Sequence, residues 1–467
     1  MRRVCMFLVA AVTAFYLINA AAAPQNTSKP DANPVAAAAP AHDAQGSANV
    51  AGGRMPGATV DADQATRAWL DTLSPVARAK SDAYFEGGYW LILWDFVVTL
   101  VVAWLLLGTG LSTRLRDFNE KLVRFKWLQT ALYVVEYMVF TTVVTLPWAL
   151  YEGYFREHQY GMSNQDMGAF MGDQMKGLLV NLILGTIALV IIYAVVRKTP
   201  RSWWIWGALV GIVLLLFTVA IGPVYLEPVF NKFYPLADGP LKQQILSMAR
   251  ANGIPAKEVF EFDASKQTKR MSAHVSGLFG TTQISLNDNL INRGSPEEVK
   301  AVLGHEMGHY VLHHVFHGMV EFGVLIVIGF AFLKWSFGKL HGRWGIRDVG
   351  DPAGLPLLAA LFAAYFFVLT PVTNTLIRTQ EAEADVFGLN ASRQPDGFAQ
   401  AAIHLSEYRK MEPGTLEEIF FYDHPSGYQR IHRAMVWKAE HIHDPDIVAY
   451  DAAHPRIEMP LEPAAQK

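Results

Sequence analysis

The chain has 467 residues, of which 52% are apolar and only 17% are charged, whereas an ordinary globular protein carries roughly 25% charged residues. This composition excludes intrinsic disorder for most of the chain and argues against a fully water-soluble protein. The 39 Lys and Arg residues nearly balance the 42 Asp and Glu residues, so the basic excess of a nucleic-acid-binding protein is lacking. Cys5 is the single cysteine, which excludes an intramolecular disulfide and leaves His and carboxylate side chains as metal ligands.

The N-terminal part of the chain differs from the rest in composition. Arg2 and Arg3 precede an apolar run that ends in small residues, so residues 1–23 have the layout of a signal peptide, with an uncleaved first membrane span as the alternative. Residues 24–62 are rich in Ala, Pro, Gly, Asn and Asp, which predicts a flexible tail. Residues 63–86 are mixed, and we expect a short helix there, lying at the membrane surface.

Six apolar runs further along the chain are long enough to cross a bilayer, whose hydrocarbon core of about 30 Å requires roughly 20 helical residues. Aromatic edges and clustered Lys and Arg between the runs favour membrane spans over the alternative, the long buried helices of a large soluble protein. The expected spans lie near residues 89–108, 129–149, 178–196, 203–223, 318–335 and 356–377.

Two polar regions separate and follow these spans. The first four spans and the surface helix occupy residues 63–223, the polar region 224–317 comes next, two spans fill 318–377, and the polar region 378–467 ends the chain. In the first polar region, two β-leaning runs between Ala273 and Leu286 suggest a hairpin.

A helix follows the hairpin. Ser295 is its expected N-cap, followed by Pro296 in the first turn and by Glu298 at the third position.

This helix carries the sharpest local signal, His305-Glu306-Met307-Gly308-His309. Positions i and i+4 share one helix face, so both imidazoles can bind one Zn²⁺, and Glu306 can take the proton of the attacking water. The alternative is a helix face with surface histidines. It is disfavoured because chance gives roughly 0.02 such patterns in a chain of this composition.

A catalytic zinc site needs a third protein ligand. Extension of the motif along the same helix fails, because Val315 stands where a third His would be required. His313 and His317 repeat the four-residue spacing, but a straight helix carries them too far along its axis to join the same ion. We therefore interpret both as polar residues near a membrane surface.

A better third ligand lies in the segment Gln380-Glu381-Ala382-Glu383-Ala384-Asp385. Glu381 and Asp385 share a helix face, while Glu383 points elsewhere. Glu381 can bind the metal, and Asp385 can accept the free N–H of a ligand imidazole. The alternative is an ordinary acidic helix face.

Several longer segments carry a family resemblance. They are LPWALYEGYFREHQYGMSNQ (146–165), PVFNKFYPL (228–236), SGLFGTTQISLNDNLI (276–291), GHEMGH (304–309), QEAEAD (380–385) and HPSGYQRI (424–431). From about residue 89 to 437 the chain resembles the integral-membrane zinc metalloproteases of the type I CAAX prenyl protease family. The resemblance implies a mainly α fold: a multi-span helical membrane protein with a zincin-like α+β catalytic domain, its HExxH helix beside a β-hairpin, and an internal hydrated chamber.

The resemblance also implies roles for individual residues. His305, His309 and Glu381 are implied as the ligands of one Zn²⁺ per chain, Glu306 as the general base, and Asp385 as the partner of a ligand imidazole. The two polar regions are then the two parts of one catalytic domain, the second of which supplies the third zinc ligand.

The resemblance implies roles for two further residues, and at two places the sequence differs from the one usual in the family. His424 and Arg430 are implied to face the catalytic centre, where they can stabilise an oxyanion or bind substrate carbonyls. Ser272-Ala273-His274 replaces the Asn-Ala-Tyr usual before the hairpin, and Gln429 replaces the usual Glu before the arginine. The zinc centre is intact, so these departures concern substrate preference.

The function expected from these observations is zinc-dependent endoproteolysis in or at the membrane. We expect two partners: a peptide or protein substrate, which includes lipidated or membrane-bound ones, and the lipid bilayer. No nucleic-acid partner is expected. An exposed edge strand beside the zinc helix can pair with an extended substrate; the alternative is a purely structural hairpin. A membrane quality-control protease without CAAX specificity is the main alternative function. A non-catalytic transporter or scaffold is disfavoured by the intact motif.

The sequence indicates a membrane location but gives conflicting signals about which side of the membrane carries the catalytic regions. The signal-like N-terminus is typical of bacterial secretion signals and predicts a multi-pass protein of a bacterial inner membrane. Loops 109–127, 197–202 and 334–355 hold five, three and four Lys or Arg residues, against two in loop 150–177. The positive-inside rule therefore predicts catalytic regions outside the cytoplasm, whereas the family resemblance implies that they open to the cytosol.

Overall fold

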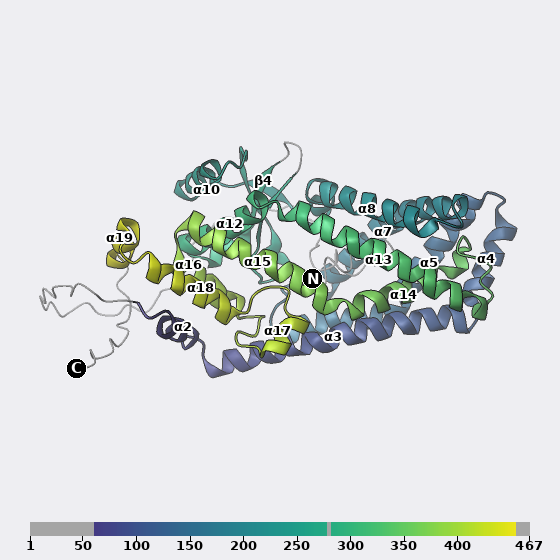
Figure 1. The fold of residues 1–467 in the computed structure, drawn as a ribbon, viewed down its shortest axis with the longest axis horizontal. Helices are drawn as coiled ribbons and strands as arrows, with labels where there is room; N and C mark the ends of the chain where they lie inside the picture. The colour runs from purple at the N-terminus through teal and green to yellow at the C-terminus, as the bar shows by residue number, and fades with distance from the viewer. Residues whose placement is uncertain (1–59, 278–281, 454–467) are drawn as a thin grey trace, which may run out of the picture.

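The computed structural model describes residues 60–277 and 282–453. The protein is elongated, with α4 at one end of a long helical bundle and α12, α16, α18 and the sheet at the opposite end (Figure 1). Helices dominate, and one small sheet accompanies them. The expected fold class, a mainly α membrane protein with an α+β catalytic region, is confirmed. The proposed signal peptide or first span, 1–23, and the tail as far as residue 59 lie outside the described residues.

Five helices in the described ranges are long and apolar enough to cross a membrane. Large apolar side chains stand out from them, such as Trp104 with 65% exposure and Val320 with 68%, which suits contact with lipid tails. The five expected spans from 89–108 to 318–335 coincide with these helices, apart from two or so residues at one end. They are α3 (Pro75–Gly108), α5 (Lys126–Leu150, continued through η2, Tyr151–Phe155, and α6, Arg156–Gln159), α7 (Met167–Lys198), α8 (Trp203–Ile221) and α13 (His314–Leu340).

The sixth expected span, 356–377, is bent. It falls on α14 (Leu355–Val368) and α15 (Thr370–Ser392), which meet at 57°. Pro371 stands in the first turn of α15, where its ring and missing N–H prevent α14 from continuing straight. The sixth expected span is therefore broken by a bend, and α15 leaves the bundle toward the catalytic end.

Two other expectations need correction. Residues 63–86 do not form one short helix, because α2 (Ala62–Leu70) ends before a turn and α3 begins at Pro75, capped by the Ser74 hydroxyl. Proline at a first helical position is preorganised to begin a new helix. The connection 109–127 is also not an open loop, since α4 (Leu111–Leu122) fills most of it.

The sheet has four strands in the order β1-β2-β4-β3. The expected hairpin is confirmed: β3 (Ala273–Ser276) and β4 (Gln283–Asn287) are antiparallel neighbours. β1 (Phe233–Pro235) and β2 (Val259–Phe262) were not expected, and β2 runs parallel to β4. β3 and β1 are the two edge strands, and β3 contacts α12.

The remaining described elements lie partly at the catalytic end and partly, as η5 and η6 do, against the membrane helices. The expected N-cap is confirmed, because Ser295 and Glu298 form a capping box at the start of α12.

The proposed domain boundaries at 317 and 377 fall inside α13 and α15, so the catalytic and membrane regions share continuous helices. The other short elements are η3 (Gly222–Leu226), α9 (Glu227–Phe230), η4 (Ala264–Lys266), η5 (His341–Trp344) and η6 (Pro352–Gly354). The other helices are α10 (Pro240–Ala251), α11 (Asp288–Arg293), α12 (Pro296–Val311), α16 (Pro395–Leu405), α17 (Thr415–Phe421), α18 (Gly427–Glu440) and α19 (Pro445–Ala453).

Candidate active site

The site forms where α12 crosses α15. A Cβ on Gly388 would lie 2.7 Å from the backbone N of His305, and one on Gly304 would lie 2.8 Å from the carbonyl O of Gly388. Only glycine at both positions allows the two backbones to touch in this way. The close approach brings side chains that are about 75 residues apart in sequence to one place.

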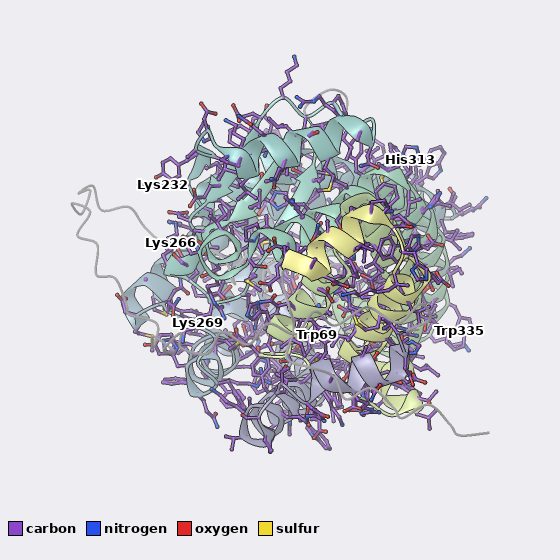
Figure 2. All side chains as sticks on the ribbon, turned by 90° about the vertical axis from the view of Figure 1, so that its left-hand side faces the viewer. Trp69, Lys232, Lys266, Lys269, His313 and Trp335 are labelled. Atoms are coloured by element: carbon purple, nitrogen blue, oxygen red, sulfur yellow. The ribbon has the colours of Figure 1, made fainter. Side chains whose placement is uncertain are left out.

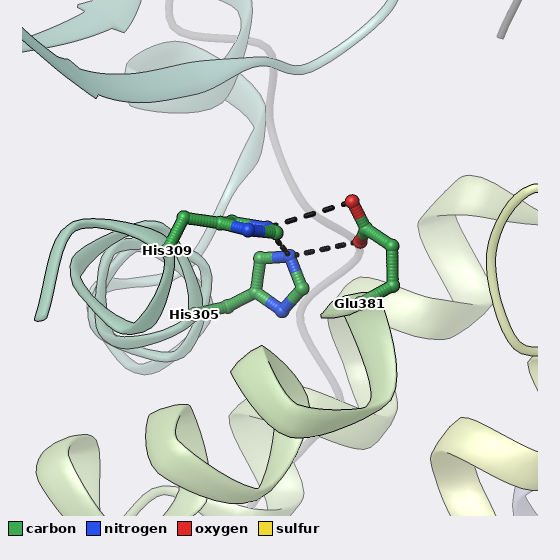
Figure 3. A group of neighbouring side chains, drawn as sticks. All are labelled: His305, His309 and Glu381. Atoms are coloured by element: carbon green, nitrogen blue, oxygen red, sulfur yellow. Dashed lines mark hydrogen bonds and ion pairs between the residues drawn. The ribbon is translucent and has the colours of Figure 1, made fainter. Parts of the chain in front are cut away.

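Three of the expected ligands converge at this crossing. His305 and His309 project from one face of α12 toward Glu381 on α15 (Figure 3). One ligand atom from each residue lies within 4.8 Å of the others. His305 and Glu381 are buried, and His309 is partly exposed. A buried group of two imidazoles and one carboxylate is a typical donor set for a divalent metal ion.

The spacing of the donors matches a metal centre. Nε2 of His305 lies 3.2 Å from Nε2 of His309 and 3.2 Å from Oε2 of Glu381, and Nε2 of His309 lies 3.5 Å from Oε1 of Glu381. Ligands about 2.0–2.2 Å from a tetrahedral Zn²⁺ stand roughly 3.3–3.5 Å apart. The two Glu381 distances involve different carboxylate oxygens, and one ligand atom from each of the three residues lies within 4.8 Å of the others, so the residues present suit this ion.

Asp385 lies behind His305, as expected. Its buried carboxylate is 2.9 Å from Nδ1 of His305 and accepts hydrogen bonds from Arg430 and from Nη1 of Arg433, the latter at 2.7 Å. Arg430 thus commits two of its donors, Nε and Nη2, to Asp385, on the side of His305 that faces away from Glu381. Nη2 of Arg430 also lies 3.3 Å from Nδ1 of His305, so the structure brings Arg430 to the centre both directly and through Asp385.

Glu306 and His424 also belong to the cluster. Glu306 follows His305 on α12 and is partly exposed, and desolvation in the site raises its pKa to about 7. His424, in the segment between α17 and α18, has its Nε2 3.3 Å from Oε2 of Glu381. Both expected residues therefore lie at the metal-binding group: Glu306 is next to His305 on α12, and His424 contacts Glu381.

The sequence did not reveal a polar contact between His309 and His314, or the contact that continues it from His314 to Glu383. Nδ1 of His309 lies 2.9 Å from Nδ1 of His314, whose Nε2 is 3.1 Å from Oε2 of Glu383. His313 and His317, which were considered instead, are both exposed. The only sign of this contact in the sequence is the adjacent pair His313-His314. Its spacing from His309 does not reveal the turn that brings His314 against His309.

Comparison with known proteins agrees with this geometry. Residues 235–438 match the model of peptidase family M48, and residues 64–232 match that of the CAAX prenyl protease N-terminal region with five membrane helices. The chain is 30% identical over 370 residues to the metalloprotease YhfN of Bacillus subtilis, covering 78% of this chain and 86% of that protein.

Eukaryotic proteins are also similar. CAAX prenyl protease 1 of Saccharomyces cerevisiae is 28% identical over 313 residues, covering 62% of this chain and 68% of that protein. The crystal structure of Ste24p from S. mikatae superimposes with a TM-score of 0.68 at 21% identity, covering 80% of this chain and 95% of that one, which shows a shared fold. The chain therefore belongs to peptidase family M48 and is a multi-pass membrane metalloendopeptidase of the CAAX prenyl protease type.

Proposed function

We propose that this protein hydrolyses peptide bonds with one Zn²⁺ held by His305, His309 and Glu381. The observation that carries the proposal is the convergence of these three donors at the α12–α15 crossing, at distances suited to a tetrahedral ion. When bound, the ion would polarise the scissile carbonyl and lower the pKa of a water molecule toward 7.

The side chains around the ion have distinct tasks in this proposal. Glu306, which follows His305 on α12, would accept the proton of the attacking water and later deliver it to the leaving amine. His424 contacts Oε2 of Glu381, the oxygen that also faces His305, and from there it can donate a hydrogen bond to the oxyanion. Asp385, held by Arg430, fixes the tautomer and orientation of His305. Arg430 thus holds Asp385 and lies beside His305 in this proposal.

The edge strand β3 is the proposed docking site for substrate. Among the described residues β3 pairs with one strand, β4, and it contacts α12, so an extended peptide paired to its other edge would lie close to the HExxH helix. Recognition through backbone hydrogen bonds tolerates varied side chains, which supports activity on polypeptides beyond prenylated CAAX sequences. A farnesylated CAAX peptide and an unfolded, casein-like polypeptide separate the processing role from the quality-control role.

The two polar regions, 224–317 and 378–467, form one catalytic unit in this proposal. The basic segments counted for orientation gather at the other end of the bundle, where Arg197 donates to the carbonyl of Gly350 and Arg347 pairs with Glu120. The positive-inside rule therefore still predicts a catalytic end outside the cytoplasm. A phosphatase that works only outside the cytoplasm, fused after Lys467, tests this. An inactive fusion together with an active cytoplasmic reporter would reverse the orientation.

The central experiment measures metal and cleavage together. Purified full-length protein should contain one zinc per chain and cleave at least one of the two test substrates, and a chelator should abolish cleavage. His305→Ala should lose most of the metal, and Glu381→Ala should lose far more than Glu383→Ala. Wild-type protein without zinc, or equal metal loss in the two glutamate variants, would contradict the proposed ligand set.

A further inference from the structure

The imidazole of His309 has a second nitrogen that faces away from the proposed metal. Its Nε2 lies 3.2 Å from Nε2 of His305, whereas its Nδ1 lies 2.9 Å from Nδ1 of His314. Nε2 of His314 is in turn 3.1 Å from Oε2 of Glu383. An unbroken series of polar contacts therefore leads from the metal centre on α12, through the start of α13, to a carboxylate on α15.

We propose that His314, oriented by Glu383, is a positioning residue that holds His309 in its metal-binding orientation and raises the affinity of the centre for zinc. The inference rests on the proposed ligand set, to which it adds a support for His309 separate from the support that Asp385 gives to His305. A hydrogen-bond partner on the free nitrogen of a ligand imidazole fixes the ring and its tautomer, and loss of such a partner typically weakens metal binding.

The proton positions along this series are mutually consistent. If Nε2 of His309 binds the metal, its proton is on Nδ1 and is donated to Nδ1 of His314. His314 then carries its own proton on Nε2 and donates it to Glu383, whose carboxylate only accepts. Each contact thus has one donor and one acceptor, and the carboxylate selects the tautomer of both rings.

An unusual turn places His314 in this position. α12 ends at Val311 and α13 begins at His314, and between them His313 adopts a left-handed conformation with φ of 57°, which is uncommon for residues other than glycine. The turn leaves His313 exposed at the periphery of the catalytic end (Figure 2) and buries His314, which is 3% exposed. His317, one turn further, is exposed. Of the three histidines that follow the motif, His314 alone faces the site.

His314 and Glu383 differ in burial, and this difference predicts which of them affects zinc affinity more. The His314 side chain is 3% exposed, whereas that of Glu383 is 57% exposed. Water can replace much of what an exposed carboxylate contributes, but it cannot reach a buried imidazole as easily. His314 should therefore influence metal binding more strongly than Glu383 does.

The test measures zinc affinity of the purified full-length protein by competition with a chelator at equilibrium. His314→Phe keeps a flat ring but removes the acceptor, and should weaken zinc binding by about 10–100-fold. His314→Gln can still accept from His309 and donate to Glu383, and should retain most of the affinity. The absorption spectrum of the Co²⁺-substituted protein should change in His314→Phe and remain close to wild type in His314→Gln, because the former releases His309 from its orientation.

Matched controls separate this inference from the proposed function. His443→Phe makes the same change at an exposed histidine between α18 and α19, away from the site, and should bind zinc like wild type, whereas His305→Ala should lose the metal. Wild-type affinity in His314→Phe, or an equal loss in His443→Phe, would overturn the positioning role while leaving the ligand set intact. Retention of zinc by His305→Ala would instead overturn the ligand set and, with it, the role of His314.

A second variant keeps the test decisive if the buried change prevents folding. Glu383→Ala alters an exposed side chain and should leave the thermal unfolding of the zinc-free protein unchanged. It should weaken zinc binding by several-fold, because the tautomer of His314 is no longer selected. If His314→Phe cannot be purified, wild-type zinc affinity in Glu383→Ala would overturn the proposal.

Discussion

Two helix crossings in this protein use glycine in different ways. At the α12–α15 crossing, added Cβ atoms on Gly304 and Gly388 would meet backbone atoms at 2.8 Å and 2.7 Å. At the α8–α13 crossing, a Cβ on Gly211 would meet only the side chains of Ile326 and Phe330, both at 3.7 Å. Side chains can yield to such an atom, whereas two touching backbones cannot.

The interiors of the two crossings differ as well. Buried apolar side chains, such as Phe322 and Ile326, fill the region where α8 meets α13. The α12–α15 crossing instead encloses the polar donors His305, Glu381 and Asp385. Packing at the α8–α13 crossing can adapt, whereas the touching backbones at the α12–α15 crossing fix the distances between the donor atoms. Small substitutions at the α12–α15 crossing should therefore strongly affect metal binding and turnover. Four predictions test this difference.

The largest effect is expected for Glu306→Gln on α12. The amide cannot accept the proton of the attacking water, so turnover should fall by about 10²–10⁴-fold or more, while zinc content should stay at the wild-type level. The matched control is Glu136→Gln on α5, a membrane helix, where the carboxylate accepts a hydrogen bond from Asn119. Near-normal peptide cleavage by Glu306→Gln would contradict the mechanism.

A glycine exchange tests the two crossings directly. Gly388→Ala should separate α12 from α15, because a cost of about 1–3 kcal/mol for overpacking exceeds the gain of roughly 1 kcal/mol in helix propensity. It should also move Glu381 relative to His305 and reduce turnover by on the order of 10²-fold. Gly211→Ala should be neutral or slightly stabilising. Thermal unfolding and cleavage rates check both, and similar behaviour of the two variants would remove the contrast.

Asp385→Ala should have a smaller effect on the same crossing. It removes the acceptor behind His305 but leaves all three proposed ligands in place, so zinc affinity or turnover should fall by about 10–100-fold. It also leaves Arg430 without its buried carboxylate. Chelator competition and steady-state kinetics measure the change. Unaltered affinity together with an unaltered rate would show that Asp385 is not part of the site.

The smallest effect concerns the N-terminal end of α12, where Nδ1 of His404 on α16 lies 2.5 Å from the buried carboxylate of Glu298. The hydrogen bond with Glu298 raises the pKa of His404 above its ordinary value. Stabilisation by the protonated ring is thus fully present below the unfolded-state pKa of about 6.5 and is lost as pH rises through the higher folded-state pKa.

His404→Gln should therefore lower the unfolding temperature more at pH 6 than at pH 9, by an amount equivalent to about 1 kcal/mol or less. Thermal unfolding across this range measures it. An equal loss at both pH values in His404→Gln would mean that the charge of the ring contributes nothing.

Local sequence patterns determined much of the fold and of the site. The apolar runs predicted the membrane helices because the bilayer demands about 20 apolar residues per span whatever packs beside them. The capping box at Ser295 and Glu298 is likewise a local hydrogen-bond pattern, and the structure reproduces it. The spacing His305 to His309 placed two imidazoles on one helix face for the same reason, since helical periodicity depends only on neighbours along the chain.

Only the tertiary structure decided which distant residues meet. The choice of Glu381 from an acidic helix depends on the crossing at Gly304 and Gly388, and the pairing of β2 with β4 depends on strands that local propensity did not reveal. The left-handed turn at His313, which carries neither Gly nor Pro as a signal, directs His314 toward His309. These features arise from contacts between segments remote in sequence, whose free energies exceed the weak local preferences of the residues concerned.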